Sequence, residues 1–345
     1  FLKNRLSVGI DAYLDKRTDM LVVRSGVPVT VGAKSAAENF DAVDNYGVEL
    51  SLGWRDHVSD FNYSVQLNGQ WRDARYRKKD WPAISTYKDV YRNGPVDMGQ
   101  WGYDCLGMFR NQAEIDKFVE DYNITQYMGY KPDQIKPGML IYRDVRGEQN
   151  PDGSYKDADG IVDDKDMVRL SRRKSNPYGM SLILGGSWKG ISLNANISSS
   201  WGGYSTHAGG SYIFMNENSL DGANLPIYWK DMFVPEDVVD DGGNVVVKQN
   251  LSAKYPNMKY SMNNEASNFW QISSFRMYLR NVSLGYTLPK EWLSKVGISS
   301  CKINVTGTNL FSFFNPYPES YTDPLTGYGT FPALRSWTVG LNLSF

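Results

Sequence analysis

The chain has 345 residues and a formal net charge of −1, so no bulk positive charge attracts it to nucleic acid, and we expect no nucleic-acid partner. Its mean hydropathy is −0.46, and no stretch approaches the roughly 18 consecutive apolar residues of a membrane helix. Aromatic residues nevertheless reach 14%. A strand that faces lipid is apolar only at every second residue, so alternation along the chain is the better test for a membrane protein.

The first predicted elements are three strands that each have one apolar face. In the first, 5–15, the apolar positions alternate with polar or charged ones: Leu6, Val8, Ile10, Ala12 and Leu14. Residues 45–54 and 61–72 repeat this period of two, which is typical of half-buried strands. Only 55–60 separate these two strands, so we expect them to form a hairpin.

A long insertion, 73–176, follows without sustained alternation. Within it, apolar residues recur at helical spacing over 112–122, which predicts one short surface helix. Alternation resumes in 177–188 and, after a two-residue turn, in 191–201. These two segments therefore predict a second hairpin.

The last predicted strands are 281–288, 301–306 and 336–345, after another long polar and aromatic loop that ends near 270. The compact segment 289–299 joins the first two of them. The final strand has apolar residues at every odd position and ends on an aromatic residue: Trp337, Val339, Leu341, Leu343 and Phe345. It has about the ten residues that a tilted strand needs to cross a bilayer, and we interpret Phe345 as a barrel assembly signal.

The eight predicted strands are joined alternately by short and long connections, so all short turns lie at one end of the sheet. Transmembrane β-barrels have short periplasmic turns and long extracellular loops. The charged strand residues share the polar face, as a wet lumen requires, except Arg280, which we expect to snorkel or to precede a bulge. We therefore predict an all-β fold, a transmembrane antiparallel β-barrel. The large loops and the Gly- and Ser-rich inner face favour an arc of a barrel wider than eight strands.

Tryptophans lie near the ends of several predicted strands: Trp54, Trp71, Trp188 and Trp337. This placement is typical of an aromatic girdle at the membrane interface. The alternative is that they belong to the core of a soluble β-sandwich, but polar faces this regular do not pack against a second sheet.

Three carboxy-terminal segments resemble a known family: 275–289 (FRMYLRNVSLGYTLP), 306–311 (TGTNLF) and 338–345 (TVGLNLSF). They are similar to the carboxy-terminal signature of SusC/RagA-type TonB-dependent outer-membrane transporters. Upstream, GMF and QAEI in 107–115 and DGIVD in 159–163 fall where that family has similar motifs.

The resemblance implies a 22-stranded barrel with an amino-terminal plug and TonB box, paired with a SusD-like lipoprotein. Neither plug nor box is visible in the sequence, so residues 1–345 resemble the carboxy-terminal portion of one such barrel domain, with about eight of its strands. The expected location is the bacterial outer membrane, in contact with lipid and with the long loops extracellular. TonB would act through the missing amino-terminal region.

An acidic run, 157–166, partly fits an EF-hand-like calcium loop. Position 1 of that pattern falls on Tyr155, which supplies no carboxylate, and Asp144 is a possible replacement ahead of the apparent insertion 150–156. The candidate ligands are Asp144, Asp157, Asp159, Asp163 and Asp166. The alternative is a solvated acidic loop, and apart from this structural calcium we expect no cofactor.

Aromatic residues of the long loops are candidates for stacking on sugar rings or peptide side chains at an extracellular mouth. They are Trp81, Tyr91, Trp101, Tyr103, Tyr212, Tyr228, Trp229 and Tyr260. The alternative for each one is that it packs the loops together.

The sequence contains no Walker loop, metalloprotease motif, nucleophile elbow or dinucleotide fingerprint, so we do not expect an enzyme. The preferred hypothesis is TonB-dependent import of a bulky nutrient, above all an oligosaccharide, together with a SusD-like lipoprotein. The alternatives are a RagA-like peptide importer, a passive porin-like channel and a soluble glycan-binding β protein.

Overall fold

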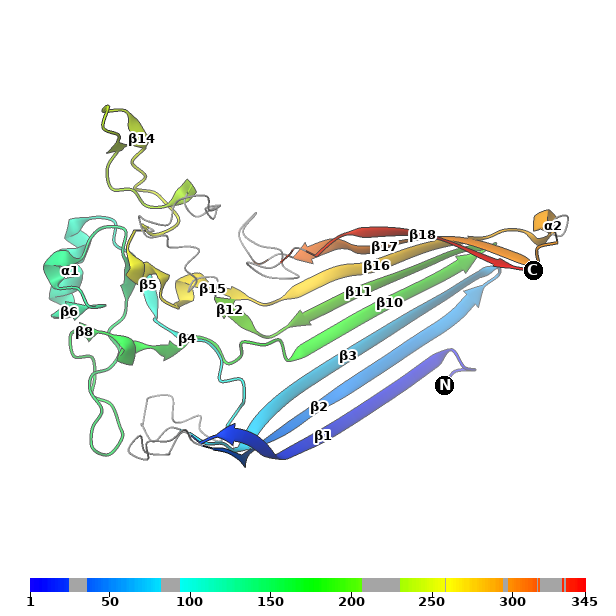
Figure 1. The fold of residues 1–345 in the computed structure, drawn as a ribbon, viewed down its shortest axis with the longest axis horizontal. Coiled ribbons are helices and arrows are strands. Elements are labelled where there is room, and N and C mark those ends of the chain that lie inside the picture. The colour runs from blue at the N-terminus through cyan, green and yellow to red at the C-terminus, as the bar shows by residue number, and fades with distance from the viewer. Residues whose placement is uncertain are drawn as a thin grey trace.

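The structure is a computed structural model that describes residues 1–24, 36–81, 94–206, 230–257, 259–293, 297–314, 316, 331 and 333–345. Eight strands form one antiparallel sheet in which each strand pairs with the next one along the chain (Figure 1). They are β1 (Leu6–Val23), β2 (Ala37–Val58), β3 (Phe61–Lys78), β10 (Tyr178–Trp188), β11 (Ile191–Trp201), β16 (Arg276–Thr287), β17 (Ser300–Phe314) and β18 (Ser336–Ser344). The predicted eight strands and their order are confirmed.

The pairing register places the apolar residues of neighbouring strands side by side. Leu67 of β3 lies opposite Leu52 of β2 and Leu182 of β10, and Leu182 lies opposite Ile197 of β11. Because side chains alternate between the two faces of a strand, this register gathers the apolar set on one face. That face is uncovered, since Leu184 and Leu284 are 37% and 53% exposed.

The apolar face has the height of a membrane. β10 and β11 have aromatic residues at their loop-side ends, Tyr178 and Trp201, whose stacked rings lie 5.8 Å apart. Trp188 lies at the turn-side end of β10. Ten steps along a strand cover about 33 Å, which at a tilt of about 40° spans about 25 Å across the bilayer. This is the height of the apolar band in outer-membrane barrels.

Short and long connections are sorted between the two ends of the sheet, as predicted. The turns at 59–60 and 189–190, the segment with α2 (Lys290–Leu293) and both chain termini lie at one end (Figure 1). The described residues of the long connections lie at the other end. Among the described residues, no helix combines the length and the apolarity that a membrane-crossing helix requires.

Five strands are longer than predicted. The outer ends of β1, β2 and β3 reach Val23, Ala37 and Lys78, and β16 and β17 are likewise longer than their apolar repeats. In β1, residues beyond the apolar band such as Arg17 and Met20 are exposed, and the sequence no longer alternates there although backbone pairing continues. Period two therefore marks the part of a strand that faces lipid and not the whole strand.

Arg280 occupies a bulge, which confirms one of its two predicted roles. Asn281 pairs with Asn196 and Leu279 with Ile197, so Arg280 is the extra residue between them. Its Nε donates to Ser198 Oγ at 2.8 Å. The bulge thus directs the arginine to the polar face although its sequence position has apolar parity.

The long connections after β3 and β11 fold together at the outer end of the sheet into a loop domain, 94–176 and 230–274. Its elements are β4 (Trp101–Gly102), β5 (Cys105–Met108), α1 (Gln112–Asp121), β6 (Gln126–Tyr127), η3 (Pro132–Gln134), β7 (Leu140–Tyr142), β8 (Ile161–Val162), η4 (Asp164–Asp166), β9 (Val168–Arg169), β13 (Val238–Val239), β14 (Val245–Val247), η6 (Ser261–Asn264), η7 (Asn268–Trp270) and β15 (Gln271–Ser273). β15 pairs with β12 (Tyr204–Thr206), which continues from β11. Helix α1 agrees with the predicted 112–122; Asn111 caps it by accepting from the Glu114 N–H at 3.0 Å.

The loop domain has its own hydrophobic core. Phe109, Ile115, Tyr127, Leu140 and Trp270 are at most 1% exposed. A buried amide, Asn263, joins the two connections: its Oδ1 accepts from the Leu140 N–H at 2.7 Å and its Nδ2 donates to the Gly138 carbonyl at 2.9 Å. The two long loops are therefore one packed unit, held above the open end of the sheet.

Candidate functional site

The second face of the sheet is polar and defines a lumen wall. Ser51, Asn68, Ser181 and Ser198 lie opposite one another across β2, β3, β10 and β11. Asn68 Nδ2 donates to Ser181 Oγ at 3.2 Å. Hydroxyl and amide groups in such rows bind water or a polar solute, so this face has the chemistry of a wet channel.

Where the lumen wall meets the loop domain, a cavity of about 450 Å³ opens, which we call the rim pocket. Strands β1, β2 and β3 and the two ends of the connection between β3 and β10 line it. The lining residues are Tyr13, Asp15, Arg17, Asn45, Arg72, Asp73, Ala74, Val96, Asp97, Arg173, Ser175, Asn176 and Pro177. The pocket therefore lies at the outer end of the polar face, where the sheet meets the loop domain.

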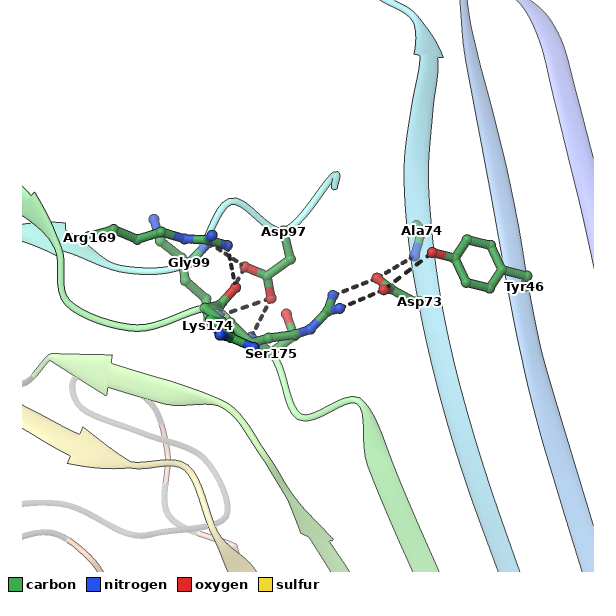
Figure 2. A network of polar contacts seen from close by, with 10 residues as sticks. Tyr46, Asp73, Ala74, Asp97, Gly99, Arg169, Lys174 and Ser175 are labelled. Carbon is green, nitrogen blue, oxygen red and sulfur yellow. Dashed lines mark hydrogen bonds and ion pairs between the residues drawn. The ribbon is translucent and has the colours of Figure 1, made fainter. Parts of the chain in front are cut away.

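A bidentate ion pair fixes one side of the rim pocket. The Arg173 guanidinium donates from both terminal nitrogens to the two Asp73 carboxylate oxygens, each at 2.5 Å. Asp73 also accepts from the Ala74 N–H at 2.7 Å, and the Tyr46 hydroxyl on the next strand lies 3.4 Å away (Figure 2). Bidentate Arg–carboxylate pairs constrain orientation as well as distance, so this pair anchors the loop domain to β3.

Asp97 organises the other side. Its carboxylate accepts N–H groups from Lys174 at 2.9 Å, Ser175 at 2.8 Å and Gly99 at 2.9 Å (Figure 2). Burial opposes ionisation, but the N–H groups of Ser175, Lys174 and Gly99 outweigh it and lower the pKa of Asp97. Gly99 has a φ of +80°, and a Cβ there would lie 1.9 Å from the Ser171 carbonyl oxygen, so this turn requires glycine.

Sequence reasoning did not single out Asp73, Asp97 and Arg173 as site residues. They lie just outside or beyond the alternating segments, where no periodicity distinguishes them from other loop charges. The one sequence feature that could have marked the site is the end of alternation at Arg72 and Asp73, where two charged residues follow each other at the end of a strand.

The four predicted loop aromatics that the structure describes do not form one ligand-facing cluster. Tyr103 is only 3% exposed and stacks on Tyr142 at 4.8 Å, which corrects its interpretation as a ligand-facing residue: it packs the loop-domain core. Tyr260 packs against the same core, and Trp101 is half-buried in β4. Trp81 lies just beyond β3, edge-on to Tyr76 at 6.0 Å. The other four predicted residues, Tyr91, Tyr212, Tyr228 and Trp229, lie outside the described residues.

In the acidic loop, Asp144 and Asp166 are buried. Asp144 Oδ2 accepts from the Gly160 N–H at 2.6 Å, while its buried Oδ1 has no hydrogen-bond partner. Asp166 Oδ1 accepts from the N–H groups of Val145 and Arg146 at 2.7 and 3.0 Å. These contacts stabilise the loop through its backbone.

The remaining predicted ligands are Asp157, Asp159 and Asp163. Asp163 is paired with the Lys165 ammonium, Asp159 Oδ1 accepts from the Ile161 N–H at 3.0 Å, and Asp157 is exposed. Within the described ranges, no group of three Asp, Glu, His or Cys side chains is placed to hold a metal ion. The orphaned Asp144 oxygen fits a cation but the arrangement around it does not, so calcium stays a prediction.

Phe345 follows β18 at the short-turn end and is 87% exposed. Its position agrees with the predicted end of the barrel, and its assembly role stays a prediction.

The sheet is a two-faced antiparallel meander with an apolar band about 25 Å high. It has short turns at one end and a folded loop domain at the other. This combination defines the wall of an outer-membrane-type β-barrel. Comparison with known proteins shows which proteins the chain resembles. TonB-dependent receptors P3 and P39 of Formosa agariphila are 22% identical over 369 residues and 23% identical over 384 residues. Each alignment covers 99% of this chain, but only 32% and 34% of the respective receptor.

Solved structures of similar fold are also found among transporters. The RagAB peptide importer in its closed-closed state matches with a TM-score of 0.65 and 18% identity, over 99% of this chain and 34% of that one. A further structure of the RagAB peptide transporter matches with a TM-score of 0.64 and 20% identity, over 99% and 34% of the two chains. No protein-family model matches the chain. The resemblance to SusC/RagA-type TonB-dependent transporters is confirmed, and the chain spans about a third of the length of these relatives.

Proposed function

We propose that this chain is the carboxy-terminal portion of the barrel domain of a TonB-dependent importer in the bacterial outer membrane, with its long loops extracellular. The observation that carries this proposal is the two-faced sheet, apolar over the height of a bilayer on one side and lined with hydroxyl, amide and charged groups on the other. A soluble sandwich would bury the apolar face under a second layer. The names of the relatives are those of receptors and transporters and not of enzymes.

The proposed cargo is an oligosaccharide, and the rim pocket is its first contact with the barrel wall. A cavity of about 450 Å³ between the wall and the loop domain accommodates one or two sugar rings and not a whole chain. The rest of a longer ligand would lie along the lumen wall and under the loop domain. Peptide is the second candidate cargo, favoured by the likeness to the RagAB peptide importer.

Two partners follow from the proposal. A SusD-like surface lipoprotein would meet the loop domain, which is a packed unit and not a set of separate loops. TonB would supply energy through the part of the transporter that lies outside the third matched here. Outer-membrane lipid would contact the apolar face.

The experiment is uptake by the native host of fluorescently labelled oligosaccharides and of a labelled peptide library, with and without a tonB deletion. We expect uptake of one cargo class that is lost in the tonB mutant. Uptake that persists without TonB, together with ion conductance in planar bilayers, would identify a passive channel. Extraction of the protein into buffer without detergent would indicate a soluble binding protein.

A further inference from the structure

We propose that the rim pocket is a subsite for an anionic group, the carboxylate or sulfate of an acidic oligosaccharide, and that Arg72 is its cationic contact. The inference rests on the proposed import function and narrows its cargo. Some polar groups of the pocket already have partners within the protein, and others do not.

Most charged side chains of the pocket already have partners within the protein. Arg173 is paired with Asp73 at both nitrogens, and Arg17 Nε lies 2.9 Å from Asp15 Oδ2. Asp97 is held by backbone N–H groups. Asn176 is engaged as well, since its Nδ2 donates to the Ser274 carbonyl at 2.6 Å and its Oδ1 accepts from the Gly203 N–H at 2.9 Å. These groups form the frame of the pocket and are not available to a ligand without breaking a protein contact.

Arg72 is the exception among the charges. Its backbone N–H donates to the Pro177 carbonyl at 3.0 Å, which fixes the position of the residue on β3. Its exposed guanidinium, which lines the pocket, has neither a hydrogen bond nor an ion pair to any other residue that the structure describes. Arginine is suited to planar, bidentate recognition of carboxylate and sulfate-like groups.

The Tyr13 hydroxyl and the Asn45 amide, which also line the pocket, likewise have no partner within the described part of the chain. Tyr13 of β1, Gly47 of β2 and Arg72 of β3 lie opposite one another. The Tyr13 hydroxyl lies 2.6 Å from where a Cβ of Gly47 would be. The absence of a side chain at Gly47 therefore lets Tyr13 lie across β2 toward Arg72.

These three groups match an acidic sugar better than a neutral one. The guanidinium binds the anionic substituent, while the phenol and the amide donate to or accept from ring hydroxyls, and the Tyr13 ring offers an apolar surface. A neutral glycan offers the guanidinium no anionic group, so it forms no charge-assisted hydrogen bonds there. One row deeper, Asp11 and Glu49 line a separate pocket, so an anionic substituent is favoured at the rim and disfavoured below it.

The test uses the full-length transporter in detergent micelles and three acidic probes: tetragalacturonate, an alginate tetrasaccharide and a sulfated carrageenan tetrasaccharide. The controls are methyl-esterified tetragalacturonate and a tetrapeptide with a free carboxyl terminus. We expect an acidic probe to bind at least tenfold more tightly than the neutral ester. Arg72→Gln should weaken this binding about tenfold to a hundredfold, the effect of losing a charge-assisted hydrogen-bond pair. Arg5→Gln is the matched control, since Arg5 is paired with Asp56 at 3.1 Å at the opposite end of the same face.

A second measurement does not depend on any variant. Phenylglyoxal modifies accessible arginines, so mass spectrometry of the wild-type protein should find Arg72 labelled faster than the paired Arg173, and an acidic probe should slow the labelling of Arg72. If no acidic probe protects Arg72, or if Arg72→Gln binds as the wild type does, the subsite is refuted while import can still stand. Arg72-dependent binding of the tetrapeptide alone would overturn the assignment to a glycan. Loss of TonB dependence with intact Arg72-dependent binding would instead refute the proposed function and leave the subsite.

Discussion

The barrel wall and the loop domain use the same apolar residue types in opposite ways. In the wall, Val339 of β18 is 72% exposed, whereas in the loop domain Leu140 and Val162 are fully buried. The wall is stabilised by a continuous antiparallel ladder and by the lipid around it, and the loop domain by a core of its own. The same composition thus supports a lipid-facing surface and a water-surrounded core within one chain, and the difference shows in how each region responds to substitution.

The largest effect is expected in the loop-domain core. Trp270 is fully buried and its Nε1 donates to the Asn263 carbonyl at 2.7 Å, so Trp270→Ala should destabilise the loop domain by about 3–5 kcal/mol. Limited proteolysis of the detergent-solubilised protein should then cut within 94–176 and 230–274 while the barrel stays intact. Trp337→Ala is the control, because Trp337 is 69% exposed on the lipid face. Equal protease sensitivity of both variants would contradict the distinction between the two regions.

The second effect separates the two faces of the wall. Leu184→Arg places a charge on the lipid face of β10 and should cost about 2–4 kcal/mol, measured by urea unfolding in lipid vesicles. Ser181→Arg places the same charge on the lumen face of the same strand and should cost much less. A reversed order would show that the faces are assigned wrongly.

The third effect concerns the contact between the two regions. Asp73→Asn should cost about 1–2 kcal/mol, because it leaves the Arg173 guanidinium, which is 26% exposed, without its carboxylate partner. Hydrogen exchange should accelerate around 94–99 and 171–176, while the core near Trp270 keeps its protection. Unchanged exchange at the rim would mean that the ion pair does not anchor the loop domain.

The smallest effect is a pH dependence in the acidic loop. Burial, followed by the charges of Asp166 and Asp159, raises the pKa of Asp144. The folded state therefore holds this proton more tightly than the unfolded state does, and the resulting stabilisation is lost as the pH rises through the folded-state pKa. Asp144→Asn should flatten this dependence and raise the melting temperature of the loop domain at pH 7 in the absence of calcium. A variant that melts with the pH profile of the wild type would exclude Asp144 as the titrating group.

Calcium tests the same loop from the other direction. Calorimetric titration of the full-length protein is the measurement: heat with calcium beyond a magnesium control, abolished by Asp144→Asn, would show that a cation satisfies the orphaned Asp144 oxygen. Absence of any such heat would remove the predicted metal site.

The wall could be predicted from the sequence because every second residue faces lipid and is apolar. This period of two is visible in segments such as 177–188 and 336–345. The loop domain could not be predicted in this way. Its core is built from short pieces far apart in sequence, such as Leu140 and Asn263, which the sequence does not mark as neighbours. The rim pocket lies where the wall meets the loop domain. Its key feature is that the Arg72 side chain has no partner among the described residues, which only the folded structure reveals.

Site-directed spin labelling of the full-length protein in lipid vesicles tests the central claim most directly, with one label at a time along β10 and β11. We predict that oxygen accessibility, which reports lipid, and nickel-chelate accessibility, which reports water, alternate from residue to residue in opposite phase, with Leu182 and Leu184 on the lipid side and Ser181 and Gly185 on the water side. Low accessibility to both reagents at Leu182 and Leu184 would mean that a second protein layer covers the apolar face, and the account of a transporter wall would be wrong.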